Sequence, residues 1–223
     1  MDESFFRGFS EDLHDPTRWA AFYKREQSKD PNLPKEIPSV PSMDAEWLFN
    51  EMMSVSSSPD PWVFPALQKL KENGQFIVAA LSNTVIFPPG HKLQREHFFD
   101  EPARKIFDVF ISSAHVGIRK PDSAMYQLAL ARVDEYAKAN AQSARGQGLN
   151  WESGVKPEEI VFLDDIGENL KGARKQGFRT IKVDLGRAFE AVDELERVTG
   201  LKLAGDHPRI PIEPRFQTVK AKI

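Results

Sequence analysis

Two short apolar runs without alternation limit the folds open to this chain more than any other feature. Residues 76–81 and 160–163 contain no polar side chain. A strand with one face in water alternates apolar and polar residues, whereas a strand of a parallel sheet is covered by helices on both faces. The two runs therefore predict strands of a parallel sheet that lies between two layers of helices.

Segments with the helical spacing of apolar residues separate the strand-like runs. The predicted helices cover residues 62–73, 121–133 and 168–176. Pro121 is placed to begin the second helix, and Gly74 and Gly177 are placed to end the first and third. The inward positions of the second helix are Met125, Leu128, Ala129 and Val133. Two further runs predict strands, at residues 109–111 and 178–183. This order predicts right-handed crossovers and a doubly wound, Rossmann-like α/β sheet.

The composition and the apolar pattern of the chain change near residue 58. The preceding residues are polar, are interrupted by prolines and contain no strand-like run. They predict a small helical cap with apolar helix faces at residues 19–23 and 47–53, and we interpret their aromatic residues as cap packing rather than as a substrate-selecting surface. Residues 138–157 predict a surface excursion. The predicted division is a cap-like segment at 1–58, an α/β core at 59–205 and a C-terminal tail or peripheral strand at 206–223.

Charge, cysteine content and histidine spacing exclude several classes of function. Lys and Arg number 30 against 33 Asp and Glu, which gives a formal charge of −3 with no long basic run, so we expect no nucleic-acid partner. The absence of cysteine excludes a disulfide framework, a thiolate nucleophile and Cys-ligated metal sites. The histidines form no zinc-binding pair. There is no leader pattern and no apolar segment of about 18 residues, so we expect a cytoplasmic protein without a membrane partner.

Polar residues follow the predicted strands. Ser82 and Asn83 come after the first run, Asp164 and Asp165 come after the second, and Lys120 lies just before a predicted helix. Ligands of open α/β sheets bind beyond the carboxyl ends of the strands, so we expect these side chains to meet at one edge of the sheet. A hydroxyl, an ammonium group and two carboxylates can hold a phosphoryl group and a divalent cation.

Each of these residues also has a structural explanation. Taken singly, Ser82 or Asn83 is a helix cap or a turn former, and Lys120 is a surface lysine. The Asp164–Asp165 pair is equally well a cap followed by a solvent-facing acid. Their combination at one sheet edge favours a functional site.

Three motifs carry a resemblance to a known family. They are Ala-Leu-Ser-Asn-Thr at residues 80–84, the segment 107–122 that ends in Arg-Lys-Pro-Asp, and the segment 155–170 that contains Phe-Leu-Asp-Asp-Ile-Gly. In these motifs the chain resembles the haloacid dehalogenase superfamily of hydrolases. The subgroup is that of the N-terminal phosphatase domain of soluble epoxide hydrolase and the related domain of acyl-CoA dehydrogenase-like proteins. The resemblance spans about residues 43–203 and implies the fold of that superfamily.

The resemblance implies a role for each candidate residue. Ser82 would donate a hydrogen bond to an oxygen of the transferring phosphoryl group, and Asn83 would help to orient the substrate. Lys120 would offset the charge on the nucleophile and the phosphoryl oxygens. Asp164, supported by Asp165, would hold Mg²⁺. The implied ligand is a small phosphorylated molecule or a phosphate ion.

The family's nucleophile motif is absent from this sequence. The family uses an Asp at the end of its first strand, usually followed two residues later by a second Asp. No two Asp residues of this chain stand at i and i+2, and none before residue 76 follows an apolar run. No Cys and no poised Ser–His pair is expected to replace it. We interpret His115 as a packed or capping residue.

Two hypotheses of different class follow from this departure. In the first, the chain is a catalytically silent domain, a pseudoenzyme that serves as a ligand-binding or interaction module. In the second, it is a truncated form of a Mg²⁺-dependent phosphatase acting on a small phosphorylated metabolite, and a missing N-terminal segment or a partner chain supplies the nucleophile. In both, the central first strand of the sheet is missing.

A missing central strand predicts a slot between the strand that ends at Leu81 and the strand that ends at Leu163. Unpaired backbone groups and apolar side chains would face that slot. Either the two neighbours pair directly, or residues 216–223 enter as a strand, or the chain is marginally stable and depends on a partner strand. We rank the last outcome first, and we expect the side chains of residues 76–81 to be buried in a well-folded form.

Overall fold

The structure is a computed structural model that describes residues 3–55, 58–87, 89–91, 94, 98–100 and 102–212. The chain divides into two compact units. The N-terminal unit comprises residues 1–58 and 86–96, and the core unit comprises residues 59–85 and 97–223. No helix in the described ranges has the length and apolar character that crossing a bilayer requires.

The described part of the N-terminal unit is helical. Its helices are α1 (Glu3–Leu13), α2 (Pro16–Lys29) and α3 (Ala45–Val55). Asp15 caps α2, because its Oδ1 accepts hydrogen bonds from the backbone N–H groups of Thr17 and Arg18. The helices predicted around residues 19–23 and 47–53 are confirmed as α2 and α3, whereas α1 was not predicted.

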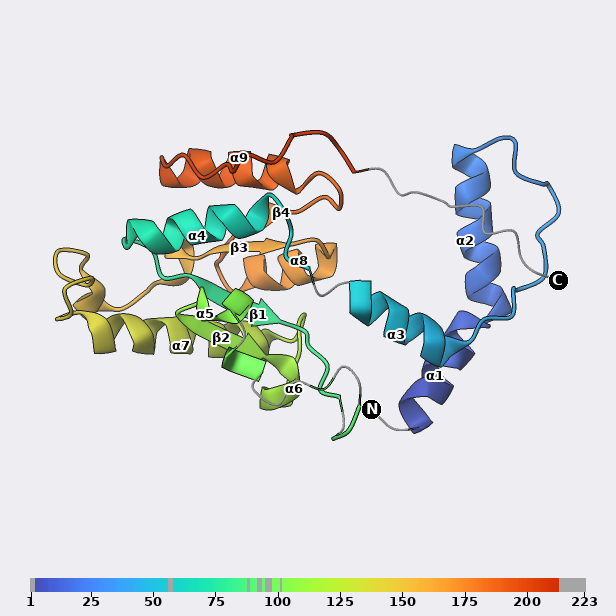
Figure 1. Ribbon diagram of the computed structural model, residues 1–223, viewed down its shortest axis with the longest axis horizontal. Helices are drawn as coiled ribbons and strands as arrows, with labels where there is room; N and C mark the ends of the chain where they lie inside the picture. The colour runs from blue at the N-terminus through green and yellow to red at the C-terminus, as the bar shows by residue number, and fades with distance from the viewer. Residues whose placement is uncertain are drawn as a thin grey trace. The chain divides into compact units, whose positions relative to one another are not determined.

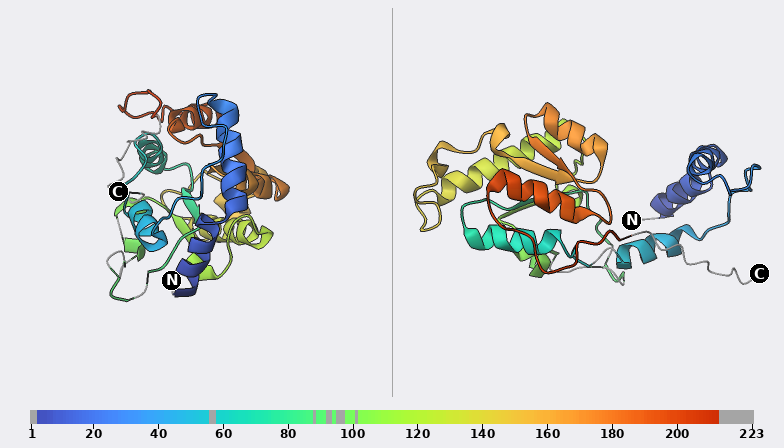
Figure 2. Two further views of the ribbon diagram at one scale, coloured as in Figure 1. Left: turned by 90° about the vertical axis from the view of Figure 1, so that its right-hand side faces the viewer. Right: turned by 90° about the horizontal axis from the view of Figure 1, so that it is seen from above.

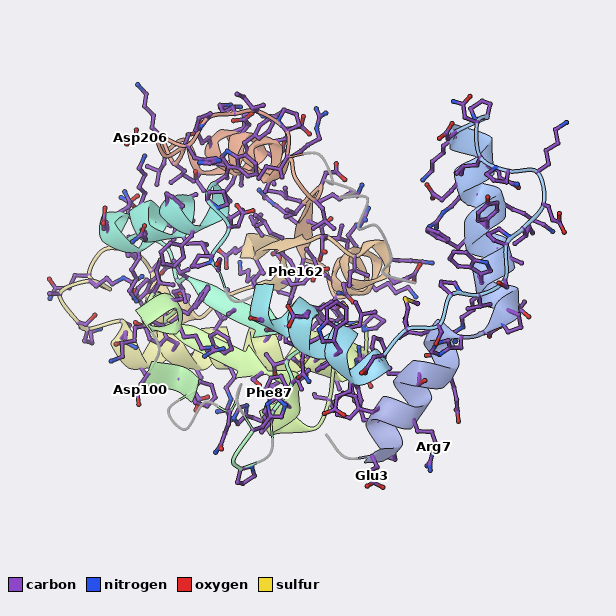
Figure 3. The ribbon with its side chains drawn as sticks, turned by 45° about the vertical axis from the view of Figure 1, so that its right-hand side comes forward. Glu3, Arg7, Phe87, Asp100, Phe162 and Asp206 are labelled. Atoms are coloured by element: carbon purple, nitrogen blue, oxygen red, sulfur yellow. The ribbon has the colours of Figure 1, made fainter. Side chains whose placement is uncertain are left out.

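An aromatic cluster joins α1 to α3. The rings of Phe5, Phe6 and Phe9 lie with their centroids 5.1, 5.9 and 5.8 Å from that of Phe49, which is 8% exposed. Edge-to-face contacts of this kind are favourable beyond the apolar area that they bury. Glu3 and Arg7 project from the other side of α1 (Figure 3). The helix is therefore held by its aromatic face.

The core unit contains two pairs of parallel strands. The strands are β1 (Ala79–Ser82), β2 (Val109–Ser112), β3 (Val161–Asp164) and β4 (Arg179–Lys182). β1 pairs with β2, placing Ser82 opposite Ser112, and β3 pairs with β4, placing Asp164 opposite Lys182. The four predicted strands are thus confirmed as parallel. Within the described ranges no ladder joins β1 to β3, so the two neighbours of the predicted slot have not closed on each other.

Helices cover both faces of the strands (Figures 1 and 2). α4 (Val63–Asn73) and α9 (Ala188–Thr199) lie on one face, and α7 (Ser123–Asn140) and α8 (Gly167–Lys175) on the other. In β3, Val161 and Leu163 pack toward α4 and α9, whereas Phe162, labelled in Figure 3, packs toward α7 and α8. The core unit is a three-layer α/β/α structure, as predicted. Shorter elements complete it: η1 (Phe98–Asp100), α5 (Pro102–Lys105), α6 (Ser113–Val116), η2 (Trp151–Ser153) and η3 (Pro157–Glu159).

The predicted helix ends are confirmed at two places and wrong at one. Gly74 and Gly177 follow α4 and α8 with φ angles of 80° and 87°, which glycine adopts without strain. Pro121 does not begin α7. Asp122 is the N-cap, and its Oδ1 accepts a hydrogen bond from the N–H of Ala124. Of the four predicted inward positions of α7, three are buried and Leu128 is half-buried.

The predicted surface excursion at residues 138–157 is wrong in part, because it covers a buried charge. Asp108, which precedes β2, has a side chain only 1% exposed. Arg145 donates to both of its carboxylate oxygens, at 2.6 and 3.0 Å, and Tyr136 donates at 3.0 Å. Lys71 also bonds it. Trp151, at 6% exposure, packs beneath the Arg145 guanidinium. A segment rich in small polar residues is thereby tied to the core.

The expected burial of residues 76–81 is also wrong in part. Val78 is 4% exposed, but Ala79 is exposed and Leu81 is half-buried. The reason is that β1 has a strand, β2, on one edge, and no strand of the described chain on the other. The proposed entry of residues 216–223 lies outside the described residues.

The Asp108 cluster predicts a specific acid dependence of stability. Burial opposes its charge, but the hydrogen bonds from Arg145, Lys71, the Val78 N–H and Tyr136 outweigh burial and lower the Asp108 pKa from 3.8 to about 2. A depressed folded-state pKa stabilises the fold above about pH 4, and this contribution is lost as the pH falls toward 2. Asp108→Asn should cost roughly 2 kcal/mol at neutral pH. The substitution should also make the free energy of unfolding less dependent on pH between about pH 2 and 4.

Urea unfolding between pH 2.5 and 7 measures both effects. The exposed Asp206 provides the matched control. Asp206→Asn should leave the free energy of unfolding within about 0.5 kcal/mol of the parent at every pH. An Asp108→Asn profile parallel to that of the parent would refute the assignment.

The edges of β1 and β3 on which no described strand lies predict marginal stability of the isolated chain. Buried strand edges without partners leave backbone N–H and C=O groups unsatisfied, at a cost in free energy. We expect a broad thermal transition below about 60 °C, together with a tendency to self-associate. Calorimetry combined with light scattering measures this. A cooperative transition of the monomer above that temperature would contradict it.

Candidate functional site

A buried ion pair lies at the carboxyl edge of the strands. The Nζ of Lys120 donates to Oδ2 of Asp164 at 2.7 Å, and the two side chains are only 10% and 5% exposed. Asp164 ends β3, and Lys120 lies in the loop between α6 and α7, which follows β2. The pair therefore links the half of the core unit that contains β2 to the half that contains β3.

The second oxygen of Asp164 is held by residues at the start of α8, the helix that follows β3. Oδ1 accepts hydrogen bonds at 2.9 Å from the N–H of Ile166 and from Nδ2 of Asn169, a side chain buried in α8. Tyr126 of α7 donates its hydroxyl to the Asn169 carbonyl at 2.8 Å. Burial, and then the charge of Asp164, raises the pKa of Tyr126 to about 12, so the phenol remains a donor. Both oxygens of Asp164 are thus occupied.

Lys120 is held by its backbone as well as by its ammonium group. Asn83 donates from Nδ2 to the Lys120 carbonyl at 3.1 Å and accepts from the Lys120 N–H through Oδ1 at 2.9 Å. The ammonium also lies 5.3 Å from the centroid of the Phe162 ring, a favourable cation–π contact. In this arrangement the Asn83 amide orients Lys120. Its predicted role in orienting substrate stays a prediction.

Ser82 ends β1 at the same edge, beside Ser112 of β2. It is partly exposed, and its predicted contact with a phosphoryl oxygen stays a prediction. A Ser–His contact that was not predicted lies at this edge, where Ser112 Oγ is 2.7 Å from Nδ1 of His115. The two residues are three apart across the turn of α6, a spacing that brings side chains together. Ser112 is only 1% exposed, so its hydroxyl is shielded from substrate and does not replace the absent nucleophile.

The carboxylates present do not fit a magnesium site as they stand. Mg²⁺ takes oxygen ligands in octahedral geometry and is usually held by one or two carboxylates with water and substrate. Asp165 is exposed and available, but Asp164 is bonded to Lys120, Ile166 and Asn169. Among the described residues no three His, Cys, Asp or Glu side chains gather around a common point.

Sequence reasoning found Lys120, Asp164 and Asn83 but missed Asn169 and Tyr126. Asn169 follows Asp164 by five positions, about one helical turn beyond the strand end, and this spacing was the available signal. Tyr126 carried no such signal, because an aromatic residue on an apolar helix face is usually core. Together these groups fix a buried ammonium group at the edge where Ser82 ends its strand, an arrangement suited to binding an oxyanion.

The buried pair predicts strong non-additivity between two substitutions. Lys120→Met leaves the Asp164 carboxylate buried without its counter-charge and should cost roughly 3 to 5 kcal/mol of unfolding free energy. Lys120→Met combined with Asp164→Asn keeps the volume of both side chains and removes both charges, so it should cost far less. Denaturant titration of the single and double variants measures this. Additive losses would show that the two charges do not interact.

Comparisons with known proteins identify the family of this chain. A family model described as haloacid dehalogenase-like hydrolase matches residues 19–177. Over 100 residues the chain is 40% identical to the Acyl-CoA dehydrogenase family member 10 of Mus musculus, covering 45% of this chain and 7% of that protein. Over 156 residues it is 33% identical to the Bifunctional epoxide hydrolase 2 of Sus scrofa, and the match covers 70% of this chain and 24% of that protein.

A third relative is the (S)-2-haloacid dehalogenase 4A of Burkholderia cepacia, 28% identical over 145 residues that cover 63% of this chain and 51% of that protein. The chain spans less than two thirds of the length of each of these relatives. The family model matches well over half of the chain. The protein therefore belongs to the haloacid dehalogenase-like hydrolases.

Proposed function

We propose that this hydrolase domain binds the phosphoryl group of a small phosphorylated molecule, or phosphate itself, and is catalytically silent as the chain stands. The observation that carries the proposal is the Lys120 ammonium group, which Asp164 and Asn83 hold in place at the carboxyl edge where Ser82 ends β1. Phosphoryl transfer depends mainly on positioning and on neutralising charge at the phosphoryl oxygens. An ammonium group and a hydroxyl supply the binding part of that task.

The absence of turnover follows from the missing attacking group. Covalent phosphoryl transfer needs a nucleophile in line with the leaving group. The sequence contains no Asp pair at i and i+2, and the Asp164 carboxylate is bonded on both oxygens. Positioning alone does not replace a nucleophile. On this proposal the chain acts in the cytoplasm as a ligand-binding or interaction module.

The second candidate is a truncated Mg²⁺-dependent phosphatase that another segment or a partner chain completes. Two observations favour it: Ser82, Lys120, Asp164 and Asp165 occur together, and β1 and β3 each have one edge without a described strand. A long-silent site has no physical reason to keep two adjacent carboxylates. A strand that brought in a carboxylate would compete for Lys120 and free Asp164 to join Asp165 at the cation. Without it, Mg²⁺ should bind weakly.

Hydrolysis of p-nitrophenyl phosphate tests the absence of turnover. We expect the purified chain with Mg²⁺ to hydrolyse this ester no faster than buffer. Turnover that survives purification and disappears in Lys120→Ala would overturn catalytic silence and support an active phosphatase. The double variant Lys120→Met/Asp164→Asn provides a control that is expected to be better folded than the single variant.

Calorimetric titration with tungstate tests anion binding separately. The parent chain should bind weakly, and the double variant should bind at least about tenfold more weakly, because a charge-assisted hydrogen bond contributes about 1.5 to 3 kcal/mol. Equal binding by the two proteins would show that no anion site is assembled at Lys120.

A further inference from the structure

Thr84 lies two residues beyond Ser82 and is held by hydrogen bonds to the start of α6. Its N–H donates to Ser113 Oγ at 2.9 Å, and the Ser113 hydroxyl donates weakly to its carbonyl at 3.4 Å. Its own Oγ1 accepts from the N–H of Ala114 at 3.3 Å and lies 2.5 Å from Ser112 Oγ. Both the backbone and the side chain of Thr84 are therefore fixed to residues 112–114.

The hydroxyls at this junction are used in an unusual way. Ser112 occupies the N-cap position of α6, but its side chain makes no capping bond. A serine at that position normally accepts from a backbone N–H of the following turn. Here Thr84 accepts from Ala114 instead, which frees the buried Ser112 hydroxyl to join Thr84 to His115. The Ser112 side chain therefore connects Thr84 to His115 instead of capping α6.

The side chains of Thr84, Ser112 and His115 form a continuous chain of hydrogen bonds. Thr84 Oγ1 accepts from the Ala114 N–H and shares a hydrogen bond with Ser112 Oγ. Ser112 Oγ in turn lies 2.7 Å from Nδ1 of His115, within hydrogen-bond distance. The His115 ring packs against Phe99, with centroids 4.8 Å apart.

Ser82, which ends β1, and the two residues that follow it are thus anchored at three places. Ser82 is in register with Ser112, Asn83 is bonded twice to the Lys120 backbone, and Thr84 is bonded to residues 112–114. The first anchor fixes the end of the strand, and the other two fix the direction in which the loop leaves it. The position of the Ser82 hydroxyl relative to the Lys120 ammonium depends on all three.

We infer that Thr84 is a positioning residue for the anion site, acting through Ser112 and His115, and that its hydroxyl orients the loop that carries Ser82 and Asn83. The inference rests on the proposed function, since it concerns the same oxyanion. Loss of the Thr84 hydroxyl removes one of the two hydrogen-bond partners of the buried Ser112 hydroxyl, and a buried polar group that loses a partner favours rearrangement of the loop. Ser82 and Asn83 would then be displaced with Thr84.

The test compares Thr84→Val, which keeps the shape of the side chain, with Thr84→Ser, which keeps the hydroxyl. Calorimetric titration with tungstate should show affinity reduced about fivefold in Thr84→Val, as for the loss of one net hydrogen bond, and within about twofold of the parent in Thr84→Ser. Equal affinity of Thr84→Val and the parent, or equal losses in both variants, would overturn the inference.

A destabilising control separates positioning from general loss of stability. Leu195→Ala removes a buried side chain of α9 and should lower the unfolding midpoint without changing tungstate affinity. If Thr84→Val does not fold, His115→Phe carries the test, because it keeps an aromatic ring against Phe99 and removes the nitrogen that hydrogen-bonds Ser112. Weaker tungstate binding in His115→Phe supports the inference, and unchanged binding overturns it.

The Lys120→Met/Asp164→Asn variant distinguishes the two levels of the proposal. If this variant binds tungstate as tightly as the parent, the anion site itself is wrong and the role of Thr84 falls with it. If it binds more weakly while Thr84→Val binds normally, the anion site stands and only the positioning role is wrong.

Discussion

The ion pair between Lys120 and Asp164 is the interaction on which the arrangement of the site depends. Removing two charges from water is costly, and the attraction between them offsets that cost only when the remaining hydrogen-bonding groups are also satisfied. That condition is met here, since Asn83 holds the Lys120 backbone while Ile166 and Asn169 occupy the free oxygen of Asp164. The pair also connects the β1–β2 half of the core unit to the β3–β4 half, and no backbone ladder joins these described strand pairs. The ion pair therefore helps to fix the two halves relative to each other.

Two kinds of interaction form the site at the sheet edge. Apolar packing of the strands between two helix layers places Ser82 and Asp164 at the edge, and this depends on side-chain volume rather than on identity. Polar residues then fix the orientation of each functional group. Asn83, Asn169 and Tyr126 each hold one group and have no other described function. A site assembled in this way is oriented before any ligand arrives, which lowers the entropic cost of binding.

The same division explains what could be predicted from the sequence. Burial on both faces leaves a local pattern, so the strands and the residues that follow them were found. Asp108 and Arg145 lie 37 positions apart in segments of ordinary polarity, and only the folded chain brings them together. The Ser112–His115 pair was missed for a different reason. Reactive Ser–His pairs come from distant segments, whereas this one lies within a single turn and serves to connect loops.

The charges at the edge constrain what it can bind. The Lys120 ammonium is paired with Asp164, and the exposed Asp165 comes next in the chain, so these three groups together carry a negative charge. A phosphoryl group that approaches Lys120 must share the ammonium with Asp164 and is repelled by the nearby charge of Asp165, which explains why an anion should bind weakly. Both oxygens of Asp164 are already bonded, so the two carboxylates do not hold a cation that would offset this repulsion. The edge therefore offers an approaching anion one shared ammonium group rather than a formed site for an anion and a cation together.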